Sequence, residues 1–377
     1  MMIAITPLDT LFFRDGRPFS MGDDTWADGI FPPLPFTIYG AMRSVYIAYK
    51  GDLRKFKNGG MKNSIGAEDE HGSFKIKGIF IQRGSDIFYP LPCDQAKDKD
   101  SKNNDSKNKA HAMQMETVES LFFTNAVTKN LIFPKNIENA KSVDGGFLDE
   151  ITLGEYLNAE DNVYLYNYMC DFVLNEPKTG IKRSNDTHTT EEGYLYRVGM
   201  DRLAQLNPDR SINEVSILVD YEGLDDFPDN CMLRLGGEAK SAVVKRVDTF
   251  KTPELLPKSK ARINKNKKFK LYFATPAIFK YGWLPGGMDS KTLIWEKNGC
   301  KLKLLTVVIG KPVMVGGWDL ANNKPKPMRK AVPAGSVYYF EILEGDAENI
   351  ASTFHYKNIS DFGAQEGFGL SLAGVIS

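Results

Sequence analysis

Short apolar stretches separated by turns rich in glycine, proline and aspartate recur along this chain, and this feature constrains its fold most strongly. Residues 1–11 and 269–273 alternate in side-chain direction, which is typical of strands. Further strands are expected at 74–82, 87–91, 214–219, 232–247, 302–309, 337–343 and the C-terminus. Helices are few and do not alternate regularly with strands. The pattern predicts an α+β fold.

One expected helix carries two kinds of face. Between Thr37 and Lys50, apolar residues repeat at helical spacing: Ile38, Met42, Val45 and Tyr49. A second face interleaves rings with cations, at Tyr39, Arg43, Tyr46 and Lys50. This mixture suits single-stranded RNA, because rings stack on bases and cations meet phosphates; ordinary packing against a strand is the alternative. Gly40 indicates a close approach by another backbone. A shorter helix is expected to start at Thr152, which has capping-box spacing with Glu155.

The length of 377 residues predicts about two domains. We place an N-terminal domain at 1–249, a lysine-rich linker at 250–268 and a C-terminal domain at 269–377. The polar stretch at 95–110 lacks apolar anchors, so we expect a disordered insertion. Residues 181–203 read as two strands around a polar turn, and predict a projecting β-hairpin.

Composition excludes some classes of protein. The chain contains no apolar run of the ~20 residues that a membrane-spanning helix requires, and its N-terminus does not resemble a secretory signal. Four widely spaced cysteines favour neither a zinc site nor a disulfide framework, so a cytoplasmic location is expected. The net charge is zero, yet basic residues crowd Lys240–Lys270 and acidic residues dominate after Glu341. Such segregation allows one basic and one acidic face, or simply solvated loops.

Catalytic motifs are weak. The sequence has neither a phosphate-binding loop nor a nucleophile elbow. Gly22–Asp24 resembles a polymerase metal turn but lacks flanking apolar strands, so no metal or cofactor is expected. Of the four histidines, only His188, in the expected hairpin turn, is placed where a general base for RNA cleavage would be credible. An exposed polar residue is the simpler interpretation.

Glycine-rich and basic loops carry more information. Glycines let a backbone approach phosphate closely, and arginine offers a planar fork to phosphate or a base edge. Three segments combine these features: FFRDGRPF (12–19), RLGGEAKSAVVKR (234–246) and VMVGGWDL (313–320). Each by itself is also compatible with a plain β-turn.

Six segments of the chain, taken in order, resemble the family of third RAMP subunits of type III-B CRISPR effectors, the Cmr complexes. These segments are FFRDGRPF, PPLPFTIYGAMRS (32–44), RLGGEAK, TPAIFKYGWLP (275–285), VGGWDL and PKPMRKAVPAGSVYYFEI (325–342). The C-terminal EGFGLSLAG resembles the glycine-rich loop of RAMP proteins. The resemblance runs from residue 5 to residue 374 and is weak over 51–141.

The resemblance implies two tandem ferredoxin-like, or RRM-like, RAMP domains. It implies a non-catalytic scaffold in an antiviral ribonucleoprotein, which binds the 5′ handle of the guide RNA. The implied protein partners are the large polymerase-like subunit and neighbouring RAMP backbone subunits. By the same resemblance, RNA contact is expected at Arg14, Arg17, Thr37, Tyr39, Gly40, Arg43, Arg183, Gly236, Gly237, Lys240, Gly316, Gly317, Trp318, Gly367 and Gly369.

Two other functions remain open at this point. A RAMP endoribonuclease that processes guide-RNA precursors shares the fold but needs a general base, and no histidine lies near the first helix. A general single-stranded RNA chaperone is disfavoured by the neutral charge and by the lack of an aromatic RNP-like strand.

Overall fold

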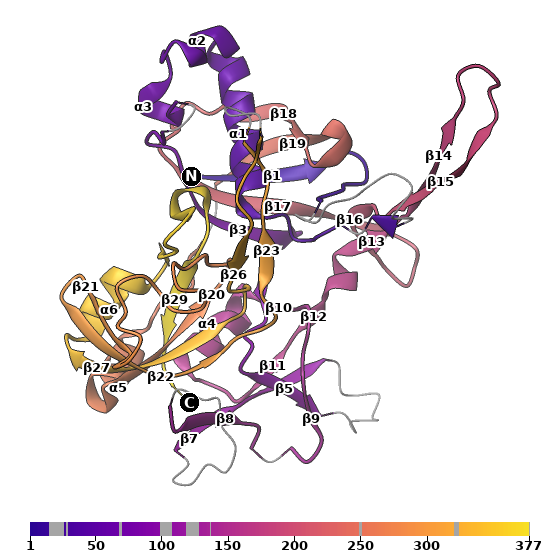
Figure 1. The fold of residues 1–377 in the computed structure, drawn as a ribbon. Helices are drawn as coiled ribbons and strands as arrows, with labels where there is room; N and C mark the ends of the chain where they lie inside the picture. The colour runs from indigo at the N-terminus through magenta and orange to yellow at the C-terminus, as the bar shows by residue number, and fades with distance from the viewer. Residues whose placement is uncertain are drawn as a thin grey trace. The chain divides into compact units, whose positions relative to one another are not determined.

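The chain folds into two compact units that interleave along the sequence (Figure 1). The computed structural model describes residues 1–14, 26–27, 29–67, 70–98, 108–117, 128–135, 137–248, 251–319 and 324–376, without the side chains of 26–27, 192–194 and 318–319. Unit 1 comprises Met1–Ser85, Cys170–Asp248 and Met314–Arg329. Unit 2 comprises Asp86–Met169, Thr249–Val313 and Lys330–Ser377. The fold is mixed α and β, rich in sheet.

Unit 1 is built from short strands and three helices. Its elements are β1 (Met2–Pro7), β2 (Trp26–Ala27), α1 (Pro35–Lys50), α2 (Leu53–Lys57), α3 (Lys62–Ile65), β3 (Lys75–Arg83), β13 (Val173–Asn175), β14 (Lys178–Arg183), β15 (Thr190–Val198), β16 (Asp201–Leu206), β17 (Ile212–Glu222), β18 (Asn230–Leu235), η2 (Gly237–Ala239), β19 (Lys240–Val247), β24 (Trp318–Asp319) and β25 (Lys324–Pro325).

The main strands of unit 1 lie in the order β3-β17-β1-β19-β18. Strand β1 is central and antiparallel to both neighbours, with Ile3 opposite Val219 on one side and Arg246 on the other. The expected alternation in this first strand is confirmed, since Ile3 and Ile5 are buried. Strand β17 continues into a second pairing with β16, which in turn pairs with β13.

Helix α1 begins two residues before the expected start, with Pro35 in its first turn. A proline is tolerated there because its missing N–H has no partner within the helix anyway. Ile38 and Met42 are buried, as the apolar spacing predicts. Tyr39 and Tyr46, assigned to the polar face, are buried as well. Tyr49, assigned to the apolar face, is exposed, and Val45 is half-buried. The buried face is therefore turned toward Tyr39 and Tyr46, and the expected placement of Tyr49 in it is wrong.

The expected hairpin is confirmed by the antiparallel pairing of β14 with β15 (Figure 1). Its second strand ends at Val198, earlier than expected, and residues 201–206 form β16 instead. The turn residue His188 adopts a left-handed backbone conformation, with φ of 56°.

Unit 2 contains a second sheet and three helices. Its elements are β4 (Asp86–Pro90), β5 (Gln95–Asp98), β6 (Lys109–Ala112), β7 (Gln114–Thr117), β8 (Asn130–Phe133), β9 (Ala140–Ser142), β10 (Gly146–Asp149), α4 (Glu150–Asn158), β11 (Val163–Leu165), β12 (Asn167–Tyr168), α5 (Pro257–Asn266), β20 (Lys268–Phe273), β21 (Ile294–Lys297), β22 (Cys300–Val308), β27 (Val337–Glu344), α6 (Ala347–Phe354), β28 (Lys357–Asn358), η3 (Ala364–Glu366) and β29 (Leu370–Gly374). Three short elements span the unit boundaries: η1 (Met169–Asp171), β23 (Val313–Val315) and β26 (Arg329–Ala331).

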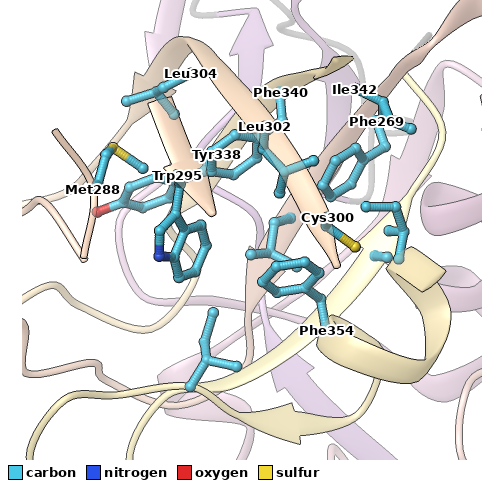
Figure 2. Packing of buried hydrophobic residues seen from close by; sticks show 14 of the residues in the cluster. Phe269, Met288, Trp295, Cys300, Leu302, Leu304, Tyr338, Phe340, Ile342 and Phe354 are labelled. Atoms are coloured by element: carbon cyan, nitrogen blue, oxygen red, sulfur yellow. The ribbon is translucent and has the colours of Figure 1, made fainter. Parts of the chain in front are cut away.

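The larger sheet of unit 2 has the order β21-β22-β27-β20-β29-β28. One of its faces packs into an aromatic core, in which Phe269, Phe340 and Trp295 lie close to Phe354 of α6 (Figure 2). The rings of Phe269 and Phe340 stack with centroids 5.4 Å apart. Burial of each such side chain stabilises the unit by roughly 1.5–3 kcal/mol.

Regular elements occur in two segments that were expected to be irregular. Gln95–Asp98 and Lys109–Ala112 pair as strands β5 and β6, and Gln95, Ala96 and Ala110 are buried. The ends of the 95–110 insertion are therefore part of a sheet, while 99–107 lies outside the described residues. The segment at 250–268 contains helix α5, whose Ile263 is buried, and its basic side chains form ion pairs within unit 2: Lys258 with Glu160 and Lys260 with Glu348. Its role as a linker stays a prediction.

Two further expectations need comment. The N-cap of α4 is Asp149, whose side chain accepts a hydrogen bond from the Thr152 backbone N–H, so Thr152 does not start the helix. The domain boundaries at 249 and 269 stay predictions. The compact units are organised differently, since 86–169 joins the C-terminal segments in unit 2.

Candidate nucleic-acid interface

Two loops that are distant in sequence meet in unit 1, after β1 and before β19. The backbone N–H of Gly237 donates to the Phe12 carbonyl at 2.7 Å. Gly236 has φ of +72°, and a Cβ atom there would lie 2.6 Å from the same carbonyl oxygen. Only glycine fits this contact. Leu11 and Asp201 exchange backbone hydrogen bonds, which ties the first loop to the start of β16.

Charged side chains surround this junction. The Lys240 ammonium lies 3.0 Å from Asp9 and 3.3 Å from Glu238. Its hydrogen bond to Asp9 is the main reason why the pKa of Asp9 falls to about 2, and the charge of Lys178, at the base of the hairpin, lowers it further. Arg202 lies 3.9 Å from Asp9 and binds Glu176 with two nitrogens. We call Asp9, Lys178, Arg202 and Lys240 the loop cluster.

The loop cluster contains groups that the sequence did not single out. Asp9, Lys178 and Arg202 are far apart along the chain, and only the pairing of strands brings them beside Lys240. Lys178 lies just before the predicted hairpin at 181–203, and no sequence pattern linked it to Lys240. An anionic polymer at this junction would meet the charged groups of Lys240 and Arg202, and it would have to compete for them with Asp9, Glu176 and Glu238.

The start of α1 meets another predicted segment. A Cβ atom at Gly317 would lie 3.5 Å from the ring of Phe36, and the Lys326 N–H donates to the Gly317 carbonyl. Thr37, partly exposed in the first turn, donates its backbone N–H to Leu34. The structure thus brings Thr37 and the Gly316–Gly317 pair into one neighbourhood. The side chain of Trp318 is not described.

Three predicted contacts in α1 need revision. The Tyr39 ring is buried and stacks on Phe74 at 4.6 Å, so it is not available to a base. Arg43 donates to the Ala67 carbonyl at 2.9 Å and lies over the ring of Phe56, and therefore holds α2 and α3 against α1. Gly40 is exposed, and a Cβ atom there would meet nothing within 4 Å. The close backbone approach inferred for Gly40 is wrong.

Other predicted residues lie elsewhere. Arg14 is exposed and its backbone bridges Gly29 beside the first loop. Arg17, Asp23 and Asp24 lie outside the described residues. Arg183 is exposed on the hairpin, with its guanidinium 3.3 Å from the Nδ1 atom of His188.

The C-terminal glycine loop belongs to unit 2. The Thr275 hydroxyl donates to the Gly367 carbonyl at 2.8 Å, and a Cβ atom at Gly369 would lie 2.5 Å from the Ser360 nitrogen. Both glycines are buried. They are accounted for by packing against residues 275–276 and 360, so RNA contact at Gly367 and Gly369 stays a prediction.

No group of three or more metal-ligating side chains occurs among the described residues. Within that part of the chain, no helix is both long and apolar enough to cross a membrane.

Comparison with known proteins adds family information. A family model described as CRISPR-associated protein (Cas_Cmr3) matches residues 3–377. A chain in a cryo-EM structure of the type III-B Cmr-beta bound to cognate target RNA and AMPPnP is 16% identical, with a TM-score of 0.51; the match covers 90% of this chain and 86% of the other. A chain of Cmr-beta bound to cognate target RNA is 17% identical over the same shares, with a TM-score of 0.49.

No curated protein matches the sequence. The structural likeness concerns the fold, whereas the family match extends over almost the entire sequence. The order of motifs noted in the sequence agrees with this match, and the chain belongs to the Cas_Cmr3 family of CRISPR-associated proteins.

Proposed function

We propose that this protein is a non-catalytic scaffold subunit of a type III-B CRISPR effector, which binds the 5′ handle of the guide RNA in the cytoplasm. The family match over residues 3–377 is the observation that carries the proposal. The similar Cmr-beta structures contain cognate target RNA, which supports an RNA-containing assembly. The protein partners are the large polymerase-like subunit and neighbouring RAMP backbone subunits.

The strand orders support tandem ferredoxin-like domains, the fold expected of such a scaffold. A ferredoxin-like sheet has its four strands in the order 4-1-3-2. In unit 1 this corresponds to β19-β1-β17-β3, and in unit 2 to β29-β20-β27-β22. Each unit has a helix in one of the two crossovers, namely α1 and α6.

We assign handle binding to the glycine loops and the loop cluster of unit 1, with Arg14 beside them. Lys240 is held by two carboxylates, so phosphate has to compete with Asp9 and Glu238 for its ammonium group. Binding of this kind weakens as salt increases, because phosphate contacts release counterions.

The test compares guide-RNA retention by Arg14→Ala/Lys240→Ala and by Lys301→Ala in the assembled complex. Lys301 is a matched control, because its ammonium also bridges two carboxylates, at 3.1 and 3.6 Å. The double variant should retain about tenfold less guide RNA, and Lys301→Ala should retain the normal amount. Equal retention by the double variant would contradict handle binding at this junction.

Catalysis is tested separately with labelled repeat RNA, with and without Mg²⁺. We expect intact RNA. Cleavage that disappears in His188→Ala would overturn the scaffold proposal in favour of the guide-processing endoribonuclease.

A further inference from the structure

The end of α1 leads into the short helix α2 in unit 1 (Figure 1), and the exposed side chains of this region form a surface that the predicted sites do not include. It consists of Tyr49, Leu53, Arg54 and Lys57, which we call the α2 patch. Tyr49 is 57% exposed and Leu53 is 58% exposed. Arg54 and Lys57 are exposed too. Large apolar side chains beside cations on an open surface indicate a partner with both anionic and planar groups.

The α2 patch rests on a fixed support. Asp52 caps α2 by accepting a hydrogen bond from the Lys55 backbone N–H at 2.8 Å. On the inner side, Phe56 is buried beneath the Arg43 guanidinium. The Gly60 N–H donates to the Lys55 carbonyl, which closes the chain after the helix. The patch is therefore presented by ordered backbone.

Helical geometry places the exposed side chains together. At about 100° per residue, Leu53, Lys57 and Arg54 fall within an arc of about 100°. Phe56 lies outside this arc, on the side that is buried. One surface of α2 thus displays one apolar group and two cations.

The charges of the α2 patch differ from those of its neighbours. Lys50 is neutralised by Asp226 at 2.5 Å, and Lys62 by Glu70 at 2.7 Å. In the described part of the chain, no carboxylate forms an ion pair with Arg54 or Lys57, and the nearby Asp52 is occupied by the helix cap. Two cations therefore remain available to an anionic partner.

We propose that the α2 patch binds a single-stranded stretch of RNA, separate from the contact at the glycine loops. The Lys50 ammonium lies 4.9 Å from the centre of the Tyr49 ring and covers one side of it. A base stacked on the open side is linked to phosphates, for which Arg54 and Lys57 on the following helix supply positive charge. An acidic protein segment would use the cations but would leave this ring without a planar partner. The inference rests on the proposed RNA-binding function.

The test measures binding of a fluorescently labelled single-stranded RNA to the full chain at several salt concentrations. Arg54→Ala/Lys57→Ala should lower the affinity about tenfold at low salt. It should also reduce the slope of log K against log salt by roughly 1.4, because each phosphate contact in a single strand contributes about 0.7. Tyr49→Ala should lower the affinity about tenfold with an unchanged slope, and Tyr49→Phe should bind normally.

Arg54→Lys/Lys57→Arg is the matched control, since it keeps both charges and should keep the slope. Melting temperatures identify any variant that fails to fold. If Tyr49→Ala fails to fold, Tyr49→Leu removes the ring while keeping an apolar side chain, and it should bind as weakly as expected for Tyr49→Ala. If the α2 variants bind RNA normally while Arg14→Ala/Lys240→Ala binds weakly, the α2 inference fails and handle binding stands. If the wild-type chain and its complex bind no RNA, the proposed function itself fails. Competition by poly-glutamate that depends on Arg54 and Lys57 but not on Tyr49 would reassign the patch to an acidic protein.

Discussion

The main sheets of the two units share a strand order. In each unit, one of two connections between strands contains an α-helix and the other does not, and the connection without a helix differs between the units. In unit 1, α1 connects the first two strands, and residues 223–239 connect the last two through β18 and a glycine turn. In unit 2, α6 connects the last two strands, and residues 274–299, all of them described, connect the first two through β21 without a helix. The strand order therefore does not require both helices, provided that the replacement loop is held by other contacts.

The two replacement loops are held by different kinds of contact. In unit 2, the Thr275 hydroxyl donates to Gly367 and accepts from the Leu370 N–H, and both contacts are buried. In unit 1, the turn at Gly236 is held by one backbone contact to Phe12 and by exposed ion pairs around Lys240. Buried hydrogen bonds resist salt, whereas exposed ion pairs are screened by it. Unit 2 should thus be the more rigid, and unit 1 the more adjustable by charge.

The largest effect should come from the buried polar network of unit 2. Asp94 is buried and accepts hydrogen bonds from the hydroxyls of Tyr156, at 2.8 Å, and Tyr339, at 2.6 Å. The buried Lys270 ammonium lies 3.4 Å from the centre of the Tyr156 ring. Asp94→Ala leaves this cation without a nearby negative charge, and should lower the free energy of unfolding by roughly 3–5 kcal/mol. Urea denaturation measures the loss.

Asp226→Ala serves as the control, because it removes an exposed carboxylate that also accepts from a tyrosine hydroxyl. A loss below about 1 kcal/mol in Asp94→Ala would show that water or a rearranged side chain replaces the carboxylate, and that unit 2 is less rigid than proposed.

The second effect concerns the replacement loop of unit 2. Thr275→Val keeps the shape of the side chain but leaves the Gly367 carbonyl and the Leu370 N–H without their buried partner. We expect a loss of about 2 kcal/mol in the free energy of unfolding, unaffected by 1 M salt. Thr292→Val is the matched control, because the Thr292 hydroxyl makes an exposed contact with Asp289. Equal losses in the two variants would remove the distinction between buried and exposed anchors.

The third effect is a dependence on pH. Burial lowers the pKa of Lys270 to about 8, from 10.5 in the unfolded chain. Between these values the unfolded chain binds more protons than the folded chain, so stability should rise with pH. The gain from pH 8 to pH 9.5 should be on the order of 2 kcal/mol at most. This gain should be absent in Lys270→Met. If the free energy of unfolding of the wild type instead falls with rising pH relative to this variant, the lowered pKa assigned to Lys270 is refuted.

Sequence patterns predicted the regular elements well, because alternation and helical spacing report directly which side chains face a core. The first strand, α1, the hairpin and the last strand all lie close to where they were expected. The regular elements in the polar 95–110 segment and the basic 250–268 segment were not predicted, because the composition of these segments hides tertiary partners. Ala96 pairs with His111 across a sheet, and Lys258 of α5 forms an ion pair with Glu160, which follows α4.

The candidate site was predictable only in part. The paired glycines of the 236–237 turn stand out in the sequence, and the structure shows that Gly236 is required by a positive φ and a close carbonyl oxygen. The burial of Tyr39 was not predictable, because an aromatic residue suits a core and an RNA surface equally. Asp9 and Arg202 could not be found at all, since a single pair of strand contacts, between Leu11 and Asp201, brings them together.

The smallest effect on stability, and the most informative for function, should come from Asp9→Asn. The amide keeps an oxygen that can accept from the Thr10 N–H, but it no longer carries the charge that attracts Lys240 and Arg202. Because these contacts are exposed, the melting temperature should change little, and the change should vanish in 1 M salt.

If phosphate and Asp9 compete for the same cations, Asp9→Asn should bind guide RNA about two- to fivefold more tightly at low salt, with a steeper salt dependence. RNA titrations of the wild type and the variant measure this difference. The matched control is Glu296→Gln, which frees Lys301 in unit 2 in the same way and should leave RNA affinity unchanged. Weaker binding by Asp9→Asn would mean that the ion pair instead positions the Gly236 turn, so that unit 1, like unit 2, depends on a fixed loop.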